Sequence, residues 1–196
     1  KIVEKITAPC KGIDKKKFVN IEEVEVTIRE NVKLVENKLN CIFKEVILII
    51  DSFDYLCINI SGFKKLNGSQ VLKENISYIL NLLKLTVSEK EQSKTILHIF
   101  NSKSILDGTY VKNLPIGLFG DFYSHELTFF LIGNNDHKNI NQVFKKNNLK
   151  IQKILIKNFI EGVQLINQNN IQSFFKIKIK KDQSHLTFFD DAAFRY

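Results

Sequence analysis

Apolar residues recur at every third or fourth position in three long segments, the spacing typical of helices that bury one face. Asn20, with Glu23 three residues later, and Ser69 are the expected caps of the first two helices. The third is expected to start at Asn134 or Asn135 and to run through Lys146, with Asn147-Asn148 supplying a residue that tolerates the left-handed backbone that ends it. The inward positions are Ile21, Val24, Ile28, Val35 and Leu39; Leu72, Ile76, Ile79, Leu80 and Leu83; and Ile140, Val143 and Phe144.

Runs of β-branched and aromatic residues between these helices predict strands. The run at residues 44–50 is apolar enough to predict a buried strand. Further elements are expected as strands at residues 55–61, 63–66, 95–100, 104–106, 123–132 and 150–157, a short helix at 159–166, and a hairpin of residues 174–180 with 185–189. Because helices and strands alternate throughout, the fold class is mixed, α/β or α+β.

The 196 residues carry a formal net charge of +8, which raises the question of a nucleic-acid or membrane partner. Arg29 and Arg195 are the only arginines, so the chain has few guanidinium groups for bidentate recognition of phosphates and bases. A lysine-rich nucleic-acid-binding domain built on residues 11–17 and 176–181 is therefore the alternative function. The chain has no Met and begins at Lys1, so we expect a piece or a processed form of a longer protein.

The cysteines Cys10, Cys41 and Cys57 are odd in number and widely spaced, which predicts neither a disulfide framework nor a zinc site. Reduced thiols in a cytoplasmic protein are the simplest interpretation. The longest apolar run, residues 46–50, is far shorter than a membrane span, so no transmembrane or targeting segment is expected.

Few residues suggest chemistry. Asp51 and Asp54 follow a predicted strand, where ligands often bind, although a polar loop is the commoner explanation. His125 and Glu126 are neighbours within a strand, so their side chains point to opposite faces and cannot cooperate directly. His98 is expected to be a structural histidine within its strand. We assign no catalytic, cofactor-binding or metal-binding residue.

Several short motifs occur in a fixed order along the chain. They are Lys11-Gly12-Ile13-Asp14-Lys15-Lys16-Lys17-Phe18-Val19-Asn20-Ile21-Glu22, Ile96-Leu97-His98-Ile99, Leu106-Asp107-Gly108, Val111-Lys112-Asn113, Pro115-Ile116-Gly117-Leu118-Phe119-Gly120, Asn134-Asn135-Asp136, Asn139-Ile140 and Asn148-Leu149-Lys150-Ile151. Their order and spacing resemble FtsA, a family of actin-like bacterial cell-division proteins. Lys17 in place of a usual glycine and the extra Leu114 before Pro115 depart from the family pattern.

The resemblance implies a partial actin-like (ribonuclease H-like) subdomain that hosts a small inserted subdomain of the strand-helix-strand-strand (SHS2) type. It implies that residues 55–157 form the insertion and that residues 1–54 and 158–196 form two parts of the host. In the family, the insertion contacts neighbouring subunits and other division proteins and carries no catalytic residues.

Family members hold ATP and magnesium between two Gly-rich hairpins, and the first of these would precede Lys1. The resemblance places the second at residues 178–184, where Lys178 replaces an acidic residue. Lys180, Lys181 and Asp182 occupy the positions of the three glycines. Of the functional groups in the family motif, only the terminal hydroxyl is kept, on Ser184. A lysine cannot ligate magnesium, and side chains at glycine positions block close approach of the backbone to phosphate. We expect no ATP, no magnesium and no ATPase activity.

Ile177 and Ile179 alternate with three lysines, Lys176, Lys178 and Lys180, which predicts a solvated edge strand with one face inward and one outward.

The first hypothesis is therefore an FtsA-like divisome protein that acts through protein contacts. The resemblance implies a cytoplasmic protein at the inner-membrane face of the division septum. It implies other division proteins as partners, with FtsZ bound through regions outside this chain and self-association through the insertion. The second hypothesis is the nucleic-acid-binding domain. The third, a fragment of an ATP-binding actin-like protein, requires a different alignment at residues 178–184.

Overall fold

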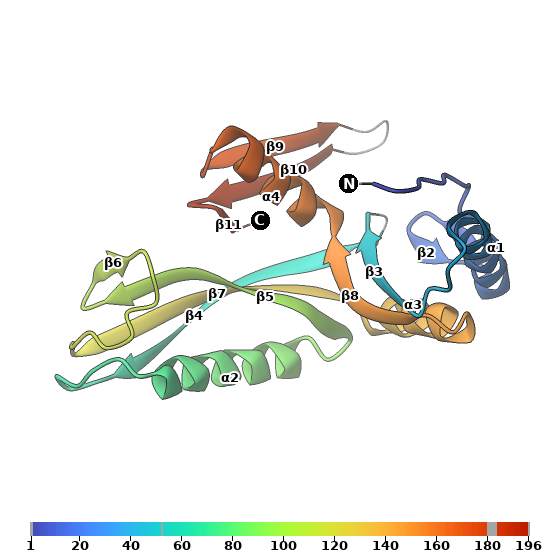
Figure 1. The fold of residues 1–196 in the computed structure, drawn as a ribbon. Helices are drawn as coiled ribbons and strands as arrows, with labels where there is room; N and C mark the ends of the chain where they lie inside the picture. Colours follow the sequence, from blue (N-terminus) through green and yellow to red (C-terminus); the bar gives the residue numbers. More distant parts are fainter. Residues whose placement is uncertain (1, 52, 180–183, 196) are drawn as a thin grey trace. The chain divides into compact units, whose positions relative to one another are not determined.

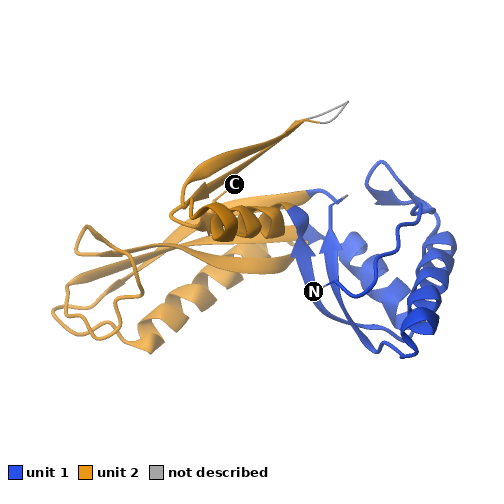
Figure 2. Cartoon of the chain, turned by 45° about the horizontal axis from the view of Figure 1, so that its top comes forward, with its two compact units in different colours: residues 1–54, 132–157 blue, residues 55–131, 158–196 orange. Residues whose placement is uncertain are grey.

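A computed structural model describes residues 2–51, 53–179 and 184–195. The chain divides into two compact units (Figure 2): Lys1–Asp54 with Ile132–Lys157, and Tyr55–Leu131 with Asn158–Tyr196. These units do not follow the subdomain boundaries expected from the resemblance. Residues 132–157 pack with the N-terminal segment, and residues 158–196 pack with residues 55–131. The assignment of residues 55–157 to an inserted subdomain stays a prediction.

The first unit joins two helices to a pair of parallel strands (Figure 1). Its elements are β1 (Ile13–Asp14), β2 (Lys17–Phe18), α1 (Ile21–Leu39), β3 (Glu45–Ile50), α3 (Asn134–Lys146) and β8 (Lys150–Ile156). The predicted cap of α1 is confirmed, because Asn20 Oδ1 accepts hydrogen bonds from the N–H groups of Glu22 and Glu23 at 3.1 and 3.3 Å. The predicted end of α3 is also confirmed, since Asn148 has a φ of 56°.

Strand β3 is buried on one face only. The prediction of a buried strand at residues 44–50 was therefore wrong for its second face, which is exposed. Ile50 is buried, whereas Ile47 and Ile49 are 58% and 50% exposed. Within the described chain, β3 pairs with β8 alone, and this two-stranded sheet lacks the layers on both faces that bury parallel strands in larger α/β proteins.

The second unit is built on a four-stranded sheet in the order β4–β7–β5–β6 (Figure 1). Its elements are β4 (Tyr55–Lys65), α2 (Lys73–Lys90), β5 (Lys94–Leu106), β6 (Thr109–Val111), β7 (Phe122–Gly133), α4 (Lys157–Asn169), β9 (Phe174–Ile179), β10 (Ser184–Asp190) and β11 (Ala193–Phe194). The strands expected separately at residues 55–61 and 63–66 form one continuous strand, β4. Those expected at residues 95–100 and 104–106 likewise form β5.

Helix α2 begins later than the sequence predicted. Its N-cap is Leu72, whose backbone N–H donates to Asn75 Oδ1 at 2.7 Å, so Ser69 is not the cap. The backbone of Val71 is engaged with the loop at residues 117–118: its N–H donates to the carbonyl of Leu118 at 2.8 Å. This pairing holds the chain extended at Val71, and the helix can start only after it.

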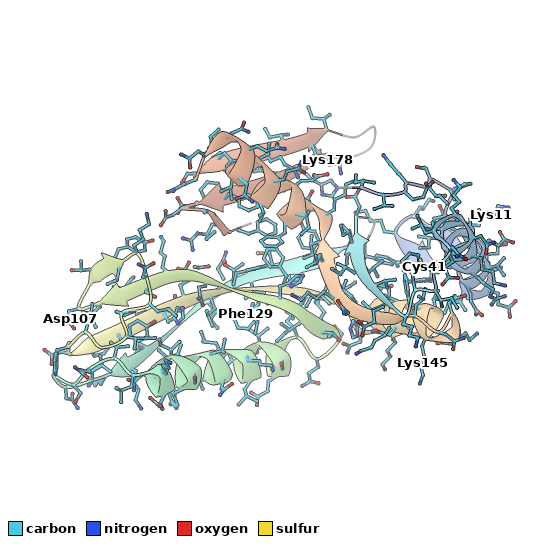
Figure 3. All side chains as sticks on the ribbon, viewed as in Figure 1. Lys11, Cys41, Asp107, Phe129, Lys145 and Lys178 are labelled. Carbon is cyan, nitrogen blue, oxygen red and sulfur yellow. The ribbon has the colours of Figure 1, made fainter. Side chains whose placement is uncertain are left out.

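Strand β7 supplies side chains to two cores. Tyr123, Leu127 and Phe129 pack with α2 on one face of the sheet, and each is fully buried. Phe129 is labelled in Figure 3. On the other face, the ring of Phe130 stacks on Phe194 with centroids 4.5 Å apart. Further aromatic rings extend this second core; they are Tyr55, Phe100, Phe159 and Phe189. Because successive side chains of a strand point to opposite faces, the sequence of β7 determines which of its residues enters each core.

Helix α4 approaches the β9–β10 hairpin closely because it carries a glycine at the contact. A Cβ atom on Gly162 would lie 2.0 Å from Cζ of Phe189, which is itself fully buried. No flexible side-chain end lies between Gly162 and Phe189. A larger residue at position 162 would therefore force the aromatic core or the helix to move.

Replacing this glycine should destabilise the protein even though alanine is the better helix former by about 1 kcal/mol. We expect Gly162→Ala to lower the free energy of unfolding by about 2–3 kcal/mol through overpacking against Phe189, measured by urea denaturation followed by circular dichroism. Gln164→Ala, at an exposed position of α4, is the matched control and should change stability by less than about 0.5 kcal/mol. A Gly162→Ala protein as stable as the parent would contradict the packing described.

Candidate functional site: the β9–β10 hairpin

The strands on either side of residues 180–183 form an antiparallel hairpin, as predicted. Strand β9 pairs with β10 from Phe174 opposite Phe189 to Ile179 opposite Ser184. Residues 180–183, where the resemblance predicts that Lys180, Lys181 and Asp182 replace glycines, lie outside the described residues. The site is therefore characterised through the two strands that flank them.

One face of the hairpin packs against α4 and contains its lysines. Lys176 Nζ forms an ion pair with Glu161 of α4, and the Lys176 side chain is only 15% exposed. Lys178 (Figure 3) lies on the same face, directly opposite His185 in the register. The predicted edge position of β9 is confirmed by the sheet order, but its lysines are half-buried and not solvated.

The other face of the hairpin is apolar and exposed, the reverse of an ordinary amphipathic strand. Phe175, Ile177 and Ile179 are 64%, 63% and 81% exposed, and Leu186 of β10 is 47% exposed. The reason lies in α4: Phe174 and Phe189 fit against the helix at Gly162, and the register then places Lys176 and Lys178 on their side of the hairpin.

Oxygen ligands for a metal are scarce in these strands. Asp190 is the single carboxylate within β9 and β10, and it lies at the end of the hairpin far from Lys178. It accepts a hydrogen bond from Ser173 Oγ at 3.1 Å and lies 3.6 Å from the Arg195 guanidinium. The described residues also contain no group of three or more His, Cys, Asp or Glu side chains that could hold a metal ion.

Asp51 and Asp54, considered as a possible carboxylate pair, are held in separate ion pairs within the first unit. Lys157 Nζ lies 3.0 Å from Asp51 Oδ2, and Lys16 Nζ lies 2.6 Å from Asp54 Oδ1. Asp136 was not singled out from the sequence. Burial raises its pKa, with Lys17 opposing the shift and Asp54 adding to it.

The histidine candidates occupy structural positions in the second unit. His125 is 1% exposed beside Tyr123, and neither of its ring nitrogens has a hydrogen-bond partner, so burial lowers its pKa. Glu126 points to the other face, as predicted, where its carboxylate lies 3.3 Å from Arg195 Nη1. The His98 ring packs beside Phe100 and Phe159.

Arg195 is the residue with an important structural role that sequence reasoning missed. It is 8% exposed, and its guanidinium lies near Glu126 and Asp190. Its backbone carbonyl accepts from Asn59 Nδ2 at 3.1 Å and from Cys57 Sγ at 3.4 Å. The one available signal would have been its rarity, because Arg195 is one of only two arginines in this lysine-rich chain.

The three cysteines are free thiols. Cys10 and Cys41 are exposed, and Cys57 is partly buried. Burial raises the pKa of Cys57 to about 11, which keeps this thiol protonated at neutral pH.

The two lysine runs proposed for nucleic acid each contain lysines that have carboxylate partners. Lys16 pairs with Asp54, and Lys176 pairs with Glu161. The runs also belong to different compact units. Each such pairing reduces the positive charge available to a polyanion.

No helix in the described part of the chain combines the length and the apolar character that a bilayer span requires.

Comparison with known proteins gives a consistent family resemblance. No model of a known protein family matches the chain. It is 23% identical over 169 residues to the cell division protein FtsA of Buchnera aphidicola subsp. Acyrthosiphon pisum (strain APS), which covers 86% of this chain and 40% of the relative. It is 26% identical over 159 residues to the FtsA of Buchnera aphidicola subsp. Schizaphis graminum (strain Sg), a match that covers 81% of this chain and 37% of the relative. The chain thus spans about two-fifths of the length of these curated relatives.

A solved structure shares the fold. A chain of a PilM-PilN type IV pilus biogenesis complex superposes with a TM-score of 0.59 at 7% sequence identity, covering 95% of this chain and 50% of that one. The chain is therefore similar in sequence to two FtsA proteins, and it shares a mixed α/β, partial actin-like fold with the chain of the pilus complex.

Proposed function

We propose that this chain belongs to a cell-division protein that acts by binding other proteins and that has lost its nucleotide site. The similarity to two cell-division proteins supports the division role. One observation carries the proposals of protein binding and of a lost nucleotide site. The β9–β10 hairpin turns its lysines toward α4 and its apolar side chains outward.

The chemistry at position 178 argues against a magnesium–nucleotide complex. Magnesium takes oxygen ligands in near-octahedral geometry, and an ammonium group at Lys178 supplies none and repels the ion. The residues of the hairpin therefore do not fit ATP and magnesium, and we derive no hydrolytic step. In this proposal Lys176 stabilises the hairpin on α4 through Glu161 instead of meeting phosphate.

Exposed apolar side chains support a protein-binding role. Besides the outer face of the hairpin, the loop before β7 exposes Ile116, Leu118 and Phe119, the last by 69%. Contiguous exposed apolar surface of this kind is typical of protein interfaces. We propose other division proteins as partners, including a further copy of the protein and, through regions outside this chain, FtsZ. The proposed location is the cytoplasmic face of the membrane at the division septum.

The chain should not bind Mg-ATP at its β9–β10 hairpin. Isothermal titration calorimetry with Mg-ATP is expected to give no saturable heat at ligand concentrations up to about 1 mM. Lys178→Asp should not restore binding, because side chains still occupy the glycine positions. Saturable binding with a micromolar dissociation constant, weakened by substitutions at Lys178, would overturn the claim of a lost nucleotide site.

A double-mutant cycle tests whether the Lys176–Glu161 pair stabilises the hairpin. Lys176→Met, Glu161→Gln and the double variant should give a coupling free energy of at least about 1 kcal/mol, because the pair is largely withdrawn from water. The same cycle on Lys38 and Glu4, whose lysine is 56% exposed, is the control and should give about 0–0.5 kcal/mol. Equal coupling in the two cycles, measured by urea unfolding, would show that Lys176 does not have this role.

A further inference from the structure

We propose that a basic cavity in the first unit, between the end of α3 and the start of strands β3 and β8, binds a phosphate group. The cavity measures about 390 Å³ and is lined by three lysines, two asparagines and two apolar residues, Leu149 and Ile151. The polar lining residues are Lys44, Asn141, Lys145, Asn148 and Lys150. We call it the α3–β8 cavity; Lys145 is labelled in Figure 3.

The α3–β8 cavity has a charge balance unlike that of the rest of the chain. The whole sequence has 29 Lys and Arg against 21 Asp and Glu, whereas the cavity lining has three lysines and no carboxylate. Lys150 lies 3.2 Å from Glu45, and its hydrogen bond is the main reason that the pKa of Glu45 is lowered. Within the described residues, Lys44 and Lys145 have no ion-pair partner, so two positive charges remain for a ligand.

The backbone fixes the positions from which these lysines extend. The N–H of Lys150 donates to the carbonyl of Lys44 at 2.8 Å, which joins the two segments at the start of the parallel strands. Asn148 takes a φ of 56° and turns the chain from α3 into β8, while Leu149 beneath it is only 4% exposed. Folding therefore offsets much of the free-energy cost of holding these cations close together before a ligand binds.

The end of a helix normally disfavours an anion, because its last carbonyls are unpaired and carry partial negative charge. At the end of α3 several of these carbonyls already accept hydrogen bonds. The N–H groups of Asn148 and Leu149 donate to the carbonyls of Lys145 and Phe144, each at 3.0 Å, and Asn147 Nδ2 donates to Val143 at 2.9 Å. The repulsion from the helix end is thereby reduced.

Phosphate suits this lining because an ammonium group acts as a compact point charge toward its oxygens and forms charge-assisted hydrogen bonds with them. The α3–β8 cavity lies at the amino ends of β3 and β8, opposite the carboxyl ends where ligands usually bind in parallel sheets. It shares no residue with the β9–β10 hairpin, and the inference does not rest on the proposed function. The phosphate could belong to a soluble molecule or to a phospholipid headgroup, which share this chemistry.

Titration of the whole 196-residue chain with inorganic phosphate tests the inference. Amide signals of residues 44, 145, 148 and 150 should shift saturably in 15N-edited NMR spectra, and sodium chloride at matched ionic strength should not reproduce the shifts. Lys44→Gln/Lys145→Gln should raise the dissociation constant at least about tenfold. The charge-matched control Lys84→Gln/Lys90→Gln, on exposed positions of α2, should leave it within about twofold.

Non-saturable shifts spread over many lysines, or equal weakening in both double variants, would overturn the inference. Thermal unfolding of both variants checks that neither result comes from a loss of structure. Co-sedimentation with phosphatidylcholine vesicles containing about 30% phosphatidylglycerol then identifies the source of the phosphate. Vesicle binding that Lys44→Gln/Lys145→Gln abolishes and the control keeps assigns a headgroup; saturable phosphate binding without vesicle binding assigns a soluble ligand.

Discussion

From residues 127 to 132, no side chain of strand β7 meets water, so each must find a partner inside the protein. The apolar residues on one face of β7 are covered by α2. On the other face, Phe130 packs among the aromatic rings around Phe194. Two polar side chains of β7 are paired: Thr128 donates to Asn59 Oδ1 at 2.6 Å, and Glu126 lies near Arg195. The buried ring of His125 is the exception. The second unit is organised around this doubly covered strand.

This constraint extends to the β9–β10 hairpin, where the family resemblance predicts the place of a phosphate loop. The aromatic core reaches β10 through Phe189, and Phe189 fits only because α4 has a glycine at position 162. Once that face is turned inward, the strand period places the lysines of β9 beside α4 and its isoleucines in solvent. The loss of nucleotide chemistry that we propose and the apolar surface that we propose for partners thus follow from the same packing.

The sequence predicted those elements whose signals are local. The Asn20 cap, the left-handed turn at Asn148 and the β9–β10 hairpin depend on residues within a few positions of one another, and all three are found. Ser69 failed as a cap because Val71 pairs with a loop some 50 residues away, a long-range contact that propensity does not encode. The inward direction of Lys176 could not be predicted either, since periodicity shows two faces without showing which one is covered.

We propose that the protein containing this chain, which is similar to FtsA in sequence, takes part in cell division. Depletion of the protein in its own organism, followed by microscopy of cell outline and DNA, tests that claim most directly. The account predicts long cells with regularly spaced, separated nucleoids and no completed septa. Cells that keep dividing at normal length after the protein has been depleted would contradict it.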